Sequence, residues 1–108
     1  MADLDWAWVA GLFEGEGCIG LQWRNGYPKP TIHIHSTDRD VLEKVVEICG
    51  GSVKGPYNNK RPNTKDYFTW GLFSKAGACG FLVAILPWLL SRRKARALEV
   101  LEVMRWKP

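Results

Sequence analysis

Residues 8–20 read WVAGLFEGEGCIG, a stretch that begins like an amphipathic helix and ends in glutamates that alternate with glycines. Each glycine inside a helix costs about 1 kcal/mol relative to alanine. Glu14 and Glu16 would also lie near the C-terminal end of this helix, where the macrodipole disfavours negative charge. The stretch therefore serves a purpose other than the stability of its own helix.

Composition indicates a single basic domain comprising residues 1–108. Of the 108 residues, 46% are hydrophobic, and the formal net charge is +4. Residues 1–20 contain four acids and no lysine or arginine, whereas residues 54–65 and 92–96 are basic and contain no acid. An acidic start beside basic patches fits a metal site within a phosphate-binding surface.

The cysteines and the apolar runs predict the compartment. Cys18, Cys49 and Cys79 form no metal-binding pattern and are odd in number, so we expect free thiols in a reducing compartment. We expect no signal peptide, because the N-terminus is acidic, and the longest apolar run, FLVAILPWLL, is too short to span a bilayer. A cytoplasmic protein, or a nuclear or organellar one in a eukaryote, with no membrane partner is expected.

Hydrophobic periodicity predicts the element order α-β-β-α-β-β-α-α. Asp3 or Asp5 is expected to cap the first helix, which would end near Glu14. The other expected helices are residues 38–49, Lys75–Leu86 and Arg92–Arg105, capped by Thr37, Ser74 and Ser91, and Leu98 and Leu101 would be packed in the last one. The expected strands are residues 18–24, 31–36, 52–57 and 67–73.

The strands alternate between apolar and polar residues. Ile19, Leu21 and Trp23 would share one face of the first strand, and Ile32 and Ile34 one face of the second. This alternation predicts an α+β fold, in which a four-stranded antiparallel sheet carries helices on one side only. The open side would expose polar and basic residues: Gln22, Arg24, Thr31, His33, His35, Lys54 and Thr69.

Residues 9–17, VAGLFEGEG, resemble the motif of the LAGLIDADG homing endonucleases at every position. Residues 34–51, IHSTDRDVLEKVVEICGG, resemble the strand-to-helix segment of that family, and residues 85–101, ILPWLLSRRKARALEVL, its C-terminal helical segment. The resemblance extends over about the whole chain. It implies the LAGLIDADG homing-endonuclease fold, with a saddle-shaped sheet.

The resemblance also implies a homodimer that binds double-stranded DNA. In this family the motif helices pack against each other at a two-fold axis, so the interface here would comprise Val9, Gly11, Leu12 and Gly15. Gly11 and Gly15 are four residues apart and lie on one helical face, which lets two backbones approach closely. A two-fold dimer would recognise a near-palindromic site.

The catalytic residues are likewise implied by the resemblance. The last acid of the motif, Glu16, and the backbone carbonyl of Gly15 would bind Mg²⁺ or Mn²⁺, with Ca²⁺ supporting DNA binding only. Gly17 would permit the sharp exit into the first strand. Arg92 and Ser36 occupy the positions that organise the attacking water, with Lys94 as the alternative to Arg92. Arg92 departs from the frequent lysine, and an arginine cannot act as a base.

The remaining expected DNA contacts are side chains that could also be merely solvated. Lys60 and Arg61 lie in the loop of residues 58–66, which is either a mobile loop or a clamp on phosphates. His33 and His35 suggest a metal site, but no third ligand lies at suitable spacing. We therefore interpret both histidines as facing DNA.

The function predicted from the resemblance is a site-specific double-strand DNA endonuclease that cuts by metal-dependent phosphodiester hydrolysis. The alternative is a catalytically inactive nucleic-acid-binding relative, such as an intron maturase or a DNA-binding regulator. A third hypothesis, a structural α+β module, conflicts with the open basic sheet face. No small-molecule substrate is expected, and the host gene, intron or intein, is left open.

Overall fold

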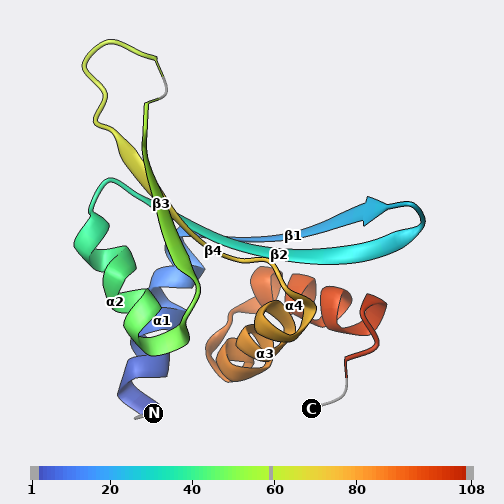
Figure 1. Ribbon diagram of the computed structural model, residues 1–108. Helices are drawn as coiled ribbons and strands as arrows, with labels where there is room; N and C mark the ends of the chain where they lie inside the picture. Colours follow the sequence, from blue (N-terminus) through green and yellow to red (C-terminus); the bar gives the residue numbers. More distant parts are fainter. Residues whose placement is uncertain (1–2, 59, 107–108) are drawn as a thin grey trace.

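The computed structural model describes residues 3–58 and 60–106. In these residues one antiparallel sheet, with strand order β1-β2-β4-β3, carries its helices on a single face and leaves the other face open (Figure 1). The strands are β1 (Gly17–Arg24), β2 (Tyr27–Ser36), β3 (Ser52–Tyr57) and β4 (Tyr67–Leu72). The helices are α1 (Asp3–Glu16), α2 (Arg39–Cys49), α3 (Lys75–Ile85), the short 3-10 helix η1 (Leu86–Trp88) and α4 (Ser91–Val103). The expected fold class and element order are confirmed.

Helix α1 leads directly into β1. Val9, Ala10 and Phe13 are buried against the sheet and α3. The helix extends to Glu16, two residues beyond the expected end, and Gly17 is the first residue of β1. A Cβ atom at Gly17 would overlap the Phe13 ring, so close packing rather than an unusual backbone angle requires this glycine.

Strands β1 and β2 form a long hairpin. Asn25 and Gly26 have φ angles of 52° and 81°, which indicate a type I′ turn. The expectation that the second strand begins at Thr31 is wrong, because pairing with β1 already starts at Tyr27. Pro28 and Pro30 are tolerated because β4 pairs with β2 only from Ile32 onward.

Two expected exposures are wrong, those of Thr31 and Leu98. Trp23 is 61% exposed, although the alternation places it on the same face as the buried Ile19, because it lies near the hairpin tip. Thr31, expected on the open side, is only 5% exposed and lies opposite Gly20. Leu98 is 49% exposed, because α4 buries Ala97 and Val100 instead.

The helix caps differ in part from the expectation. Ser74 caps α3 as expected, since its Oγ accepts the Gly77 N–H at 3.0 Å. Asp38 rather than Thr37 is the N-cap residue of α2, and the neighbouring Ser36 Oγ accepts the Asp38 N–H at 3.0 Å. Ser91 does not cap α4, whose N-cap residue is Leu90. None of the described helices is both long and apolar enough to span a membrane.

Candidate nucleic-acid interface and acidic centre

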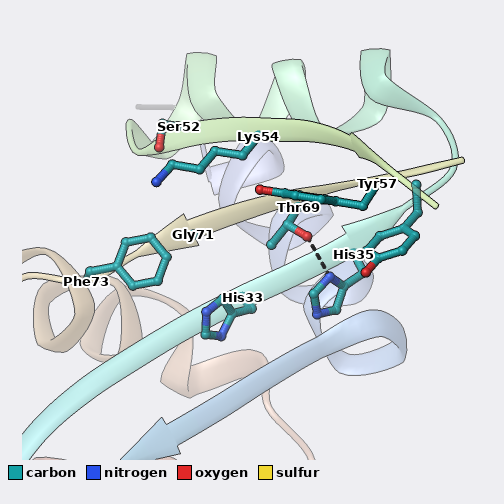
Figure 2. A pocket seen from close by; sticks show the side chains of 9 residues that line it. His33, His35, Ser52, Lys54, Tyr57, Thr69, Gly71 and Phe73 are labelled. Atoms are coloured by element: carbon teal, nitrogen blue, oxygen red, sulfur yellow. Dashed lines mark hydrogen bonds between the residues drawn. The ribbon is translucent and has the colours of Figure 1, made fainter. Parts of the chain in front are cut away.

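The open sheet face contains a hollow of about 280 Å³ between β2, β3 and β4 (Figure 2). Four of the expected DNA-contacting residues, His33, His35, Lys54 and Thr69, line it together. The remaining lining residues are Ser52, Tyr57, Tyr67, Gly71 and Phe73. The antiparallel register explains this convergence, because His35 and Lys54 both lie opposite Thr69 on the two neighbouring strands.

The two histidines form an ordered pair. Their rings are parallel within 5°, with centroids 6.1 Å apart. His35 Nδ1 lies 2.8 Å from Thr69 Oγ1, and this hydrogen bond crosses from β2 to β4 (Figure 2). Burial lowers the pKa of His33 from its ordinary value, and the neighbouring His35 lowers it further. The neutral form of His33 is therefore favoured in the folded protein.

Aromatic side chains surround the histidines, and they were not among the predicted site residues. The Phe73 ring meets His33 edge-on at 5.2 Å, and Tyr67 meets His35 edge-on at 5.9 Å. Lys54 Nζ lies 5.9 Å from the centroid of the Phe73 ring. Strand alternation could have predicted both residues, because Tyr67 and Phe73 are separated from Thr69 by an even number of positions and therefore lie on the same face of the strand.

The other expected DNA contacts lie outside this hollow. Gln22 and Arg24 are exposed near the tip of the β1–β2 hairpin. Lys60 and Arg61 are exposed in the loop that projects beyond the sheet between β3 and β4 (Figure 1). Thr31 is buried and presents almost no surface to a ligand.

A second hollow, of about 430 Å³, brings the expected catalytic residues Glu16 and Ser36 together. His35 and Tyr67 line this hollow as well as the first one. The two hollows are therefore adjacent, with His35 at their boundary. The side chain of Glu16 is exposed at the end of α1, where a ligand can reach it.

Arg93, which was not predicted, holds the junction between α1 and β1. Its Nε donates to the Glu14 carbonyl at 2.8 Å, and its Nη1 donates to the Gly17 carbonyl. These carbonyls flank the two expected metal ligands, so Arg93 positions the segment that bears them. The sequence showed only a basic run, since nothing local distinguishes Arg93 from its neighbours.

The expected water-organising residues lie at the start of α4. Arg92 is exposed and borders a third hollow, which residues 17–19 also line. These three residues directly follow Glu16 in the chain. Lys94 is half-buried, and its backbone N–H donates to the Leu90 carbonyl at 2.8 Å. The N-terminal end of α4 is thus placed beside the end of α1.

A metal ion would need more ligands than one protomer offers. Across residues 3–58 and 60–106, no three His, Cys, Asp or Glu side chains converge as a metal site requires. Glu16 and the Gly15 carbonyl supply oxygen ligands of the type that Mg²⁺ prefers, but Mg²⁺ takes six. The donor set fits a divalent ion only where a second protomer, waters or phosphate oxygens complete it.

The outer face of α1 is apolar and uncovered. Leu4 is 83% exposed, Gly11 and Gly15 are exposed, and Leu12 is half-buried. A Cβ atom at Gly11 or Gly15 would meet nothing within 4 Å in this chain. Val9, expected in the dimer interface, is completely buried in the core of its own protomer, so that assignment is wrong.

Solved structures of homing endonucleases have the same fold, although no family model matches the chain. I-CvuI, in complex with its target Sro1.3 in the presence of Ca, aligns with a TM-score of 0.75 and 24% identity over 94% of this chain and 66% of that chain. The archaeal intron-encoded I-Vdi141I, complexed with DNA, aligns with a TM-score of 0.70 and 18% identity over 95% of this chain and 68% of that chain.

A longer relative aligns equally well over this chain. The LAGLIDADG meganuclease I-AabMI, bound to uncleaved DNA, has a TM-score of 0.73 and 15% identity over 94% of this chain and 36% of that chain. The chain thus spans about two thirds of the length of I-CvuI and just over a third of that of I-AabMI. It has the LAGLIDADG homing-endonuclease fold, and the resemblance drawn from the sequence is confirmed at that level.

Proposed function

We propose that the protein is a site-specific double-strand DNA endonuclease that acts as a homodimer and requires a divalent metal ion. The observation that carries this proposal is the adjacency of the two hollows. One presents basic, polar and aromatic side chains on an open sheet, and the other presents Glu16 and Ser36. His35 lines both, so a duplex lying on the sheet passes over the candidate catalytic acid.

DNA binding is supported by the chemistry of the open face and by similar proteins. Lys54, Arg24 and Lys29 are exposed and positively charged, as contacts to phosphates require. A two-stranded ribbon fits the major groove, where every base pair is distinguishable. I-CvuI and I-Vdi141I, which share the fold, were solved in complex with DNA.

The residues around Glu16 have distinct roles in the proposed cleavage. A bound Mg²⁺, held by Glu16 and the Gly15 carbonyl, would supply charge stabilisation between the attacking and leaving oxygens. Ser36 Oγ accepts the Asp38 N–H, which leaves its own hydroxyl proton to orient a water or a phosphate oxygen. Arg92, or Lys94 in its place, stabilises negative charge on the phosphate.

The homodimer supplies the second half of the site. Close approach of two α1 helices through Gly11 and Gly15 would bring two copies of Glu16 to a common axis, which gives one carboxylate for each strand. The open space around both glycines supports this arrangement. I-AabMI has room in its longer chain for two units of this size.

Replacement of Glu16 by glutamine tests the proposal. The amide is nearly isosteric but is a poorer ligand for a hard cation. On a site selected from a randomised palindromic library, Glu16→Gln is expected to bind as wild type in Ca²⁺ and to leave the DNA uncut in Mg²⁺. Glu47→Gln, on the exposed side of α2, is the matched control and should cut normally. Wild-type cutting by Glu16→Gln would contradict the metal-ligand assignment.

The same experiment addresses the alternative, an inactive nucleic-acid-binding relative. That function is favoured by Arg92, which cannot accept a proton from water as a neutral lysine could. Wild-type protein that binds the selected duplex but cuts neither strand in Mg²⁺ or Mn²⁺ would establish the alternative. Cutting of both strands would exclude it.

A further inference from the structure

The hydrogen bond between His35 and Thr69 fixes the orientation of the His35 ring on the open side of the sheet. The two residues are directly opposed in the β2–β4 register. Because Nδ1 is engaged with Thr69 Oγ1 at 2.8 Å, the ring cannot rotate freely. The other ring nitrogen, Nε2, is left to meet a ligand (Figure 2).

The hydrogen-bonding character of Nε2 follows from the possible proton arrangements. When the Thr69 hydroxyl donates to Nδ1, the neutral ring carries its proton at Nε2. When the ring is protonated, Nδ1–H donates to Thr69 and Nε2–H is again a donor. Nε2 is an acceptor only when a neutral ring donates from Nδ1. The negative potential of DNA favours the arrangements that point an N–H toward it, so Nε2 would be presented to DNA as a donor.

A donor in the major groove selects a base that presents acceptors there. Guanine offers two, N7 and O6, whereas adenine offers N7 beside an amino donor, thymine one carbonyl oxygen and cytosine an amino donor. His35 is exposed, whereas its parallel neighbour His33 is half-buried and packs edge-on against Phe73. His35 is therefore the member of the pair that can reach a base edge.

We infer that His35 is a specificity-determining residue that selects guanine at one base pair of each half-site, and that Thr69 positions its ring for this contact. The inference rests on the proposed function, since it requires the open sheet face to lie in the major groove of a duplex. Thr69 acts through His35 and does not read the base.

The test is selection of bound sites from a randomised duplex library with two-fold symmetry, in Ca²⁺, for wild type and variants in parallel. Wild type should enrich guanine at one position of each half-site. His35→Gln should change that preference to adenine, because glutamine pairs with adenine N6 and N7. If His35→Gln does not fold, as judged by circular dichroism, His35→Asn makes the same exchange.

The Thr69 variants separate positioning from packing. Thr69→Val keeps the shape but removes the hydroxyl, and should lower the guanine preference at the same position about five- to tenfold. Thr69→Ser keeps the hydroxyl and should restore the preference. Glu47→Gln, on the exposed side of α2 and away from the open sheet face, is the control and should leave guanine selected at this position.

Two results would overturn the inference while leaving DNA recognition intact. One is a His35→Gln protein with the base preferences of wild type at every position, or with a change only at a position where wild type selects an A·T pair. The other is a Thr69→Val protein that selects guanine as strongly as wild type. A wild-type protein that binds the library but enriches no sequence, or does not bind it, would contradict the proposed function itself.

Discussion

The carboxylate of Glu14 accepts a hydrogen bond from the backbone N–H of Leu90, with Oε2 and N 3.1 Å apart. Leu90 is the N-cap residue of α4, and it has no cap from its own side chain. Glu14 therefore performs from α1 the role that Ser91 was expected to perform. The acid that is unfavourable at the end of its own helix is favourable at the start of another. This contact gives a structural reason for Glu14, the first of the two glutamates in residues 8–20.

Loss of this cap should lower stability. Glu14→Ala is expected to reduce the free energy of unfolding by about 1 kcal/mol, the usual cost of removing a capping side chain. Glu14→Gln should cost less, because its amide oxygen can still accept the Leu90 N–H. Urea unfolding followed by tryptophan fluorescence measures both. A midpoint for Glu14→Ala equal to that of wild type would show that the contact adds nothing.

Arg93 and Arg92 are adjacent but should differ sharply in effect. Arg93→Lys is expected to lower the free energy of unfolding by about 2 kcal/mol, because lysine lacks the planar guanidinium whose separate Nε and Nη1 atoms donate to the Glu14 and Gly17 carbonyls. The matched control, Arg92→Lys, replaces an exposed side chain and should stay within about 0.5 kcal/mol of wild type. Equal unfolding midpoints for the two variants would refute a structural role for Arg93.

Gly11→Leu should prevent dimerisation without unfolding the protomer. A Cβ atom added at Gly11 meets nothing within 4 Å in the same chain, so the protomer should accommodate the side chain, whereas a partner helix packed against this face would clash with it. Gly80→Leu, at an exposed glycine of α3 that is equally unobstructed, is the control. Sedimentation at micromolar concentration should give dimers for wild type and Gly80→Leu, and monomers for Gly11→Leu. Monomeric wild type, with and without DNA, would rule out the dimer.

Strand alternation allowed much of the candidate site to be predicted. It placed His33, His35 and Thr69 on one face, and the structure joins them in one hollow. The face on which a side chain lies depends only on its spacing from its neighbours in the strand, so it is predicted correctly even where the strand ends are not. The same rule, carried through to residue 73, would have found Phe73.

The wrong predictions concern features that depend on contacts between elements distant in the sequence. The burial of Val9 and the exposure of Leu98 depend on how α1 and α4 are rotated against the sheet, and an apolar residue is equally plausible on either side of such a helix. The role of Arg93 depends on a contact to residues 76 and 79 positions away. The early start of β2 was missed because Pro28 and Pro30 normally argue against a strand.

The three thiols should react in two classes. Cys18 is exposed on β1, whereas burial raises the pKa of Cys49 to about 12 and also raises that of the buried Cys79. An aromatic disulfide reagent at pH 8 should modify about one thiol per native chain and three in denaturant. Cys18 lies opposite His33 in the sheet, so the adduct should also weaken DNA binding, whereas Cys18→Ser should not. Rapid modification of all three native thiols would contradict this assignment.

His33 should make stability depend on pH. Its pKa is lowered in the folded state, so the unfolded chain binds the proton more readily. The stability that neutral His33 contributes is complete above its ordinary pKa of 6.5 and is lost as the pH falls toward the folded value. The urea midpoint of wild type should therefore fall between pH 7.5 and pH 5.5, and that of His33→Gln should fall less. Identical declines would exclude His33 as the cause.

Pro28 and Pro30 affect how the protein behaves at high concentration. In a two-residue hairpin the residues that flank the turn, here Arg24 and Tyr27, form backbone hydrogen bonds with each other. Every second residue from Tyr27 then bonds to β1, so the backbone nitrogens of Pro28 and Pro30 point away from β1, toward the edge that β4 leaves unpaired. A row of free N–H groups there would be a template for edge-to-edge aggregation between molecules. Proline has no N–H to offer, so on its β2 side the long hairpin can project from the domain without presenting donors at these two positions to strands from other copies.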